Sequence, residues 1–216
     1  MHAVTRMAIG VLGLGLASGP ASGQPAPRGD LGQGLVSDAS PFVLLVEPLA
    51  EKIVEELPAG LLYWRVESFP TLAAAKAHEG PWSLAAIAWG DVWLVTLGNQ
   101  GDITHGGRKV AEVGPIPRSP SADRVLLRVN RAGGPPGSKT PVHTHPGSEA
   151  FFVLKGQLTQ RTAHGLSRVE AGNVMNGHAP GMVMQLESTG SEHLEQLVMF
   201  VVDAEKPFST PARFEP

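Results

Sequence analysis

The sequence predicts an all-β fold, an antiparallel barrel or sandwich with a few helices. Six short segments are rich in β-branched or aromatic residues and are punctuated by Gly, Pro or Asn, as the strands of such folds are. They are residues 61–67, 92–97, 125–129, 150–154, 158–162 and 197–202. The 26 Gly and 19 Pro residues suit the many tight turns between such strands. A chain of 216 residues is long enough for one good core or two small ones.

Two helices are predicted in the N-terminal half. From Pro48 onward, Leu49, Ile53 and other apolar residues fall on one face of a helix. A second helix is predicted over residues 71–78, because the segment follows a proline and is stopped by Gly80 and the proline after it. The Ala-rich face of this second helix suits packing against a barrel wall.

The first 23 residues are typical of a secretory signal peptide. One cation, Arg6, precedes an apolar run from Met7 to Ala17, and small residues follow up to Gly23. The run has roughly eleven residues, well short of the ~20 that a membrane-spanning helix needs. We therefore expect cleavage after Gly23, a periplasmic or secreted protein, and no membrane insertion of the mature chain.

The remaining chain divides by composition. The predicted parts are a flexible linker (24–40), N-terminal strands and helices (41–120), a barrel (121–205) and a C-terminal tail (206–216). Residues 104–114 resemble residues 163–172, so the second part is either a degenerate half of the same kind as the barrel or a set of additions around a single barrel.

Charge and cysteine content narrow the partners. Lys and Arg number 17 and Asp and Glu 20, a formal net charge of −3, and no basic run with interleaved aromatics is present, which argues against nucleic acid. The sequence has no Cys, so disulfides and thiolate ligands are excluded. Histidine, carboxylate, amide and thioether groups remain as possible metal ligands.

One segment indicates a metal site. His143 and His145 are two residues apart, so on an extended strand their side chains leave the same face. A Pro-Gly-Ser turn then lets Glu149 begin a returning strand beside them, with Phe151 continuing its face into an apolar lining. Two imidazoles and a carboxylate suit a divalent ion such as Fe, Mn, Cu, Zn or Ni. The alternative is a solvated surface loop.

The spacing of this segment resembles a known family motif. From Gly137 to Gly156 it reads Gly, five residues, His-x-His, three residues, Glu, six residues, Gly, which is similar to the first motif of the cupin family. The resemblance implies a single-domain cupin of the exported bacterial type, a double-stranded β-helix (jelly-roll) barrel with a few added N-terminal helices and a metal inside it. It also implies dioxygenases, isomerases and decarboxylases as possible enzymes, and non-catalytic binding proteins as another class.

The second cupin motif departs from the family pattern, in which a histidine supplies a fourth ligand. Counting back from Gly190 puts Met184 at that position, whereas counting forward from Gly172 puts Val183 there. Three alternatives follow: an open set of three ligands, His178 as a displaced fourth ligand, or Met184 offering its thioether to a soft ion such as Cu(I). Met184 is otherwise a pocket-lining residue.

These observations predict the following function. The protein is an exported metal-binding cupin, either a dioxygenase-like or other metal-dependent enzyme acting on a small molecule, or a non-catalytic module that binds a small ligand or metal. Exposed barrel edges favour a homodimer. The further predicted pocket residues are Phe151, Gln160, Met182 and Gln185.

Overall fold

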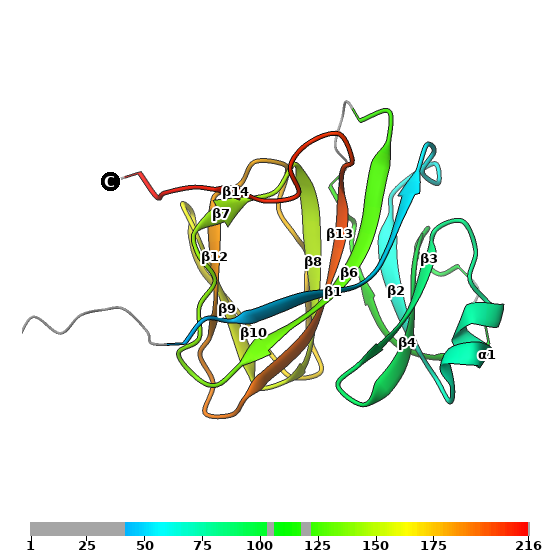
Figure 1. Cartoon of the computed structure of the whole chain (residues 1–216), viewed down its shortest axis with the longest axis horizontal. Helices are drawn as coiled ribbons and strands as arrows, with labels where there is room; N and C mark the ends of the chain where they lie inside the picture. Colours follow the sequence, from blue (N-terminus) through cyan, green and yellow to red (C-terminus); the bar gives the residue numbers. More distant parts are fainter. Residues whose placement is uncertain (1–41, 103–105, 118–121, 216) are drawn as a thin grey trace, which may run out of the picture. The chain divides into compact units, whose positions relative to one another are not determined.

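A computed structural model describes residues 42–102, 106–117 and 122–215 (Figure 1). The predicted signal peptide and linker lie outside this part of the chain. The described residues form three sheets and one helix. The first sheet has the order β1 (Leu45–Val54), β6 (Val125–Gly134), β13 (Leu194–Asp203), β8 (Gly147–Lys155), β11 (Val174–Met175). The second has the order β10 (Gly165–Glu170), β9 (Gln157–Thr162), β12 (Met184–Ser188), β7 (His143–Thr144), β14 (Thr210–Pro211).

These two antiparallel sheets face each other and enclose a barrel. Apolar side chains from both sheets meet inside it, among them Phe151 and Val198 from the first and Leu158 and Leu186 from the second. Successive residues of a strand point to opposite faces. One face of the first sheet therefore lines the barrel, and its other face is free to pack outward.

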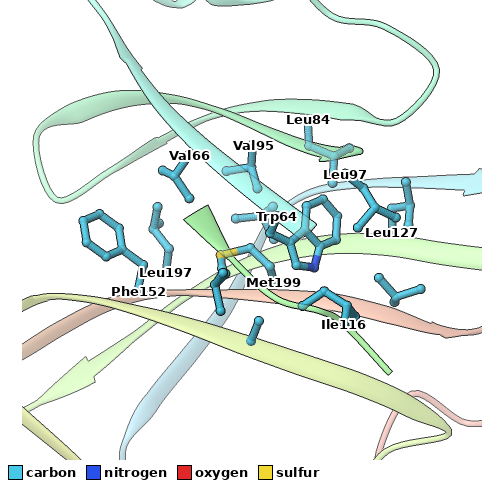
Figure 2. Close-up of a cluster of buried hydrophobic side chains, with 14 of the residues drawn as sticks. Trp64, Val66, Leu84, Val95, Leu97, Ile116, Leu127, Phe152, Leu197 and Met199 are labelled. Carbon is cyan, nitrogen blue, oxygen red and sulfur yellow. The ribbon is translucent and has the colours of Figure 1, made fainter. Parts of the chain in front are cut away.

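The third sheet packs on that outer face. It has the order β3 (Ser83–Ala88), β4 (Asp91–Gly98), β2 (Tyr63–Phe69), β5 (Arg108–Val113). Figure 2 shows its Trp64, which is fully buried, among side chains that include Leu127, Leu197 and Met199 of the first sheet. Strands far apart in sequence thus share one apolar layer, and β1 joins the first sheet although it precedes the third in the chain.

The single helix, α1 (Leu72–Ala77), covers the other face of the third sheet. Its start is capped by Thr71, whose Oγ1 accepts a hydrogen bond from the backbone N–H of Ala74 at 3.1 Å. The helix predicted over residues 71–78 is therefore confirmed. No helix in the described ranges is long and apolar enough to cross a membrane.

The helix predicted from Pro48 is wrong. Residues 45–54 form β1, which pairs with β6 along its length, with a register shift between Pro48 and Ala50. As the edge strand of its sheet, β1 tolerates a proline, which has no N–H to donate. Two arginine–glutamate pairs, Arg128–Glu51 and Arg131–Glu47, join it to β6. Long-range pairing overrides the helical spacing here.

The six predicted strand segments are confirmed, as parts of β2, β4, β6, β8, β9 and β13. Their ends are set by turns such as the one at Gly156 between β8 and β9, where φ is +73°. A Cβ there would lie 2.9 Å from the carbonyl oxygen of His193, so this turn requires glycine. The six predicted segments do not include β3, β5, β10, β12 or the short strands β11 (Val174–Met175) and β14 (Thr210–Pro211).

Candidate metal centre

Three predicted ligands come together at one end of the barrel interior. His143 belongs to β7, His145 follows directly after it, and Glu149 lies on β8. One ligand atom from each residue lies within 4.8 Å of the others, and the Nε2 atom of His145 is 3.7 Å from Oε2 of Glu149. His145 and Glu149 are buried, and His143 is half-buried.

Backbone carbonyls orient both imidazoles. The Nδ1 atom of His143 lies 2.8 Å from the carbonyl oxygen of Pro141, and Nδ1 of His145 lies 2.5 Å from that of Phe208. A carbonyl oxygen only accepts hydrogen bonds, so each Nδ1 carries the proton and donates it. Each Nε2 then keeps its lone pair, which is the form of histidine that binds a metal ion.

Burial sets the charges of the centre. Desolvation raises the pKa of Glu149 to about 8, although a hydrogen bond from Nε2 of Gln160, at 3.2 Å, lowers it. Desolvation lowers the pKa of His145 to about 4; the hydrogen bond to Phe208 opposes this shift, and the nearby His143 adds to it. Without a cation, a neutral imidazole and a protonated carboxyl group are therefore favoured at neutral pH. A bound cation would favour the carboxylate.

Gln160 holds Glu149 in place and is itself held by His178. Its amide oxygen lies 2.7 Å from Nε2 of His178. Because that oxygen accepts, His178 donates through Nε2, so this nitrogen is not free to bind a metal. The structure thus places His178 beside Gln160 and outside the group of three.

Met184 lies directly across from His143 in the pairing of β12 with β7, so the two side chains share a face. This is the residue found by counting back from Gly190. Met184 is buried, and its sulfur lies 3.4 Å from Nε2 of Gln160. Its thioether thus lies beside the amide that holds Glu149. In the part of the chain that the structure describes, His143, His145 and Glu149 are the group that could hold a metal ion.

Two facing antiparallel sheets enclose this centre, with His-x-His at β7 and the glutamate at the start of the returning β8. The barrel has the cupin fold. No protein family model matches the chain, and no curated protein does.

Solved structures are similar to part of the chain. An uncharacterized conserved protein with a double-stranded beta-helix domain from Klebsiella pneumoniae is 20% identical over 41% of this chain and 76% of its own, with a TM-score of 0.36. A cupin-like protein from Thermotoga maritima is 18% identical over 40% of this chain and 64% of its own, with a TM-score of 0.36. Oxalate oxidase in complex with the substrate analogue glycolate is 22% identical over 40% of this chain and 46% of its own, with a TM-score of 0.34. The chain thus spans under half of that enzyme.

The cupin barrel holds a cavity of about 340 Å³ beside the three residues, a volume suited to a small molecule. Its lining is mostly apolar and includes Val46, Ala132, Leu186, Val198, Phe200 and Phe208. The ring centroid of Phe208 lies 4.8 Å from that of His145 and 4.9 Å from that of Phe200. The guanidinium carbon of Arg128 lies 4.1 Å from the centre of the Phe208 ring.

Phe208 comes from the C-terminal tail, which the sequence interpretation left without a role. Figure 1 shows why it reaches the site: β14 runs beside β7, the strand that carries His143. The pairing joins Pro211 to His143 and Thr210 to Thr144. Nothing in the local sequence marks this pairing.

The other predicted pocket residues lie in three different places. Phe151 is fully buried in the barrel core next to Glu149 on β8, and Met182 is half-buried in the loop before β12. Gln185 does not line the cavity. It follows Met184 on β12 and so points to the other face, where it donates to the carbonyl oxygen of Thr140 at 2.9 Å and lines a separate hollow with Arg161.

Proposed function

We propose that this protein is an exported cupin that binds one divalent metal ion through Nε2 of His143, Nε2 of His145 and the carboxylate of Glu149. The observation that carries the proposal is the orientation of the two imidazoles. Both Nδ1 atoms are committed to carbonyl oxygens, so both Nε2 lone pairs remain for a cation within 4.8 Å of a buried carboxyl group. Export is inferred from residues 1–23, which lie outside the described ranges.

The donor set fits a borderline divalent ion. Two imidazoles and one carboxylate suit Fe(II), Mn(II), Ni(II), Zn(II) or Cu(II) better than Cu(I) or Ca(II). A bound ion would supply Lewis acidity, and iron, manganese or copper would add redox chemistry. The chain's own residues prepare the site. Gln160 holds the carboxylate, the carbonyls of Pro141 and Phe208 hold the imidazoles, and the cavity offers a mostly apolar wall to a bound ligand.

We further propose a dioxygenase-like or other metal-dependent reaction on a small molecule. Two features support an enzyme: the cavity lies directly against the proposed ligands, and three protein ligands leave positions open for substrate in an octahedral site. A homodimer is proposed as well. Its support is the edge strand β1, on which Leu45 and Val46 are exposed, together with the exposed Val43 just before it.

The decisive experiment is a metal analysis of the mature protein purified without added metal. Stoichiometric Fe, Mn, Cu, Ni or Zn is expected in the wild type and in His164→Ala, which changes an exposed histidine in the turn between β9 and β10. The ion should be missing from His143→Ala and from Glu149→Ala. If the wild type holds no ion under any loading condition, the metal proposal fails.

A second candidate function is a non-catalytic module that captures a small ligand. The observation that favours it is Met184, because a thioether stands where a fully ligated centre of this family would have a fourth imidazole. Oxygen uptake by the metal-loaded protein with small phenolic and keto compounds separates the two functions. Uptake that depends on His143 supports the enzyme. Tight binding of a ligand without turnover supports the module.

A further inference from the structure

Two side-chain amides inside the barrel lack hydrogen-bond partners. Asn130 on β6 and Gln196 on β13 are both buried, with 1% and 0% of their surface exposed. Oδ1 of Asn130, and both Oε1 and Nε2 of Gln196, have no partner among the residues that the structure describes. Buried polar groups in proteins are nearly always hydrogen-bonded. These amides therefore point to a partner that is not part of the described chain.

The strand register places both amides on the inward face of the first sheet, and Asn130 is on the wall of the cavity next to the metal centre. Asn130 lies directly opposite Val198, and Gln196 directly opposite Ala132, in the pairing of β6 with β13. Side chains directly opposite each other share a face. Asn130, Ala132 and Val198 all line the cavity of about 340 Å³, whereas Gln196 shares their inward face without being one of the lining residues.

The same register places the two amides close to the proposed metal ligand Glu149 along the strands. Phe200 on β13 lies directly opposite Glu149 on β8, and Val198 lies opposite Phe151. Asn130 is therefore one inward-facing row away from Glu149, and Gln196 is two rows away. A single small molecule can span from the metal centre to these amides.

The chemistry of this wall selects an uncharged group. Around the amides the cavity is lined by Ala132, Leu186 and Val198, which offer no charge. A buried ammonium or carboxylate would find no counter-charge at the amide end, whereas a carboxamide offers both a donor and an acceptor to a neutral group. The nearest arginine of β6 on the inward face, Arg128, is bound to Glu51 and stacked on Phe208.

We infer that Asn130, with Gln196 next to it on the same inward face, forms a polar subsite that takes an uncharged hydroxyl or carboxamide group of the ligand. The ligand would have a metal-binding end, an apolar middle and this neutral polar end. The metal-binding end rests on the proposed function, but the amide subsite does not. Asn130 would act as a specificity-determining residue that selects hydroxyl-bearing ligands over apolar ones.

Two matched probes test the inference on the zinc-loaded protein. The compounds 6-hydroxyhexanohydroxamic acid and heptanohydroxamic acid share a metal-binding hydroxamate and differ in one end group, hydroxyl against methyl. Calorimetric titration should show the hydroxyl probe binding about tenfold more tightly to the wild type, the ratio that one buried hydrogen bond gives. The preference should disappear or reverse in Asn130→Leu. It should persist in Ser148→Ala, which removes another unpartnered buried hydroxyl on the opposite face of the same sheet.

A second measurement needs neither metal nor a variant. The side-chain amide ¹⁵N–H signals of Asn130 and Gln196 should shift when 1-hexanol is added to the metal-free wild type, and should not shift with hexylammonium. If no metal binds but these signals respond to 1-hexanol, the proposed function fails and the subsite stands. If zinc binds but the hydroxyl probe gains nothing, or its preference survives Asn130→Leu, the subsite is overturned and water is the partner of these amides.

Discussion

The first barrel sheet has two faces that the same strands build from alternate residues. Facing outward, Phe152, Leu197 and Met199 pack with Trp64 in the apolar layer under the third sheet. Facing inward, the neighbouring residues include the ionisable Glu149 and Asn130, whose amide oxygen has no partner, both beside a cavity. The outer face gains stability from burial, whereas the inner face gives up stability to keep polar groups available for binding.

The largest effect on stability is expected from the outer layer. Trp64→Ala removes a fully buried indole and should lower the free energy of unfolding by about 3–5 kcal/mol. Urea unfolding of the metal-free protein measures this loss. Since Trp64 does not reach the barrel interior, the folded variant should still bind metal with wild-type stoichiometry. Loss of the metal from a variant that remains folded would show that the two faces are not independent.

On the inner face, removing an ionisable group should stabilise the protein. Because the pKa of Glu149 is raised from 4.5 to about 8, the folded state keeps a proton that the unfolded state loses, and stability falls as pH rises between these values. The cost at pH 7 is roughly 3 kcal/mol, at about 1.4 kcal/mol per pKa unit. Glu149→Gln should recover most of it in the metal-free protein.

The pH window separates this effect from that of His145. The pKa of His145 is lowered from 6.5 to about 4, so between these pH values the unfolded state binds a proton that the folded state does not. The free energy of unfolding therefore rises through His145 from pH 4 to 6.5 and is unaffected by it above pH 6.5. Between pH 6.5 and 8 the metal-free wild type should therefore lose stability through Glu149 alone, by roughly 2 kcal/mol. Urea unfolding of Glu149→Gln should show no such slope. A variant less stable than the wild type at pH 8 would contradict the assignment.

A smaller effect is expected from the tail that closes the site. A chain ending at Lys206 lacks the carbonyl oxygen of Phe208 that holds Nδ1 of His145, and its affinity for zinc should fall by about 10–100-fold. Phe208→Ala keeps that carbonyl and loses the ring, so its affinity should fall less. Competition with a chromophoric chelator measures both. If zinc affinity falls equally in the two variants, the Phe208 ring accounts for the loss and the hydrogen bond from His145 to the Phe208 carbonyl does not contribute.

The tail also shows what the sequence could not predict. The spacing of His143, His145 and Glu149 is local, because one strand, one turn and the start of the next strand bring them together. Phe208 and Asn130 reach the site through pairings between distant strands, β14 with β7 and β6 with β13, and no short-range pattern encodes these. Gln185 was misplaced because its direction depends on the register of β12, where a shift of one residue exchanges the two faces.

The same distinction explains the helix predicted from Pro48. The apolar spacing of Leu49 and Ile53 suits a helix, but the segment pairs with β6 from Leu45 to Val54. Residues 71–78, by contrast, carry their own signals, a capping threonine and a terminal Gly-Pro, and form α1 as predicted. Local signals predicted local structure, and long-range pairing decided the rest.

Metal binding should reverse the pH dependence of the inner face. A metal ion requires the carboxylate form of Glu149. In the metal-free protein this form predominates only when the pH exceeds the raised pKa of about 8. Zinc affinity should therefore rise about tenfold from pH 6.5 to 7.5 and level off above pH 8. At pH 7, calorimetry in buffers of different ionisation enthalpy should detect about one proton released per ion. Binding without proton release would contradict a buried, protonated Glu149.

The smallest effect is expected from the outer surface of the second sheet. Lys139 and Glu187 form an ion pair of 3.4 Å beside the hollow that contains Gln185, and each side chain is 32% exposed. Exposed pairs contribute about 0–1 kcal/mol, so Lys139→Ala should change the free energy of unfolding by no more than this and leave zinc affinity as in the wild type. Urea unfolding and chelator competition measure the two quantities. Because β12 carries Gln185 outward and Met184 inward, this variant also tests whether a change on one face reaches the other. A clear loss of zinc affinity would mean that a change on the outer face of β12 reaches the metal centre on its inner face. The division of stability and binding between the two faces, as seen in the first barrel sheet, would then not hold for the second sheet.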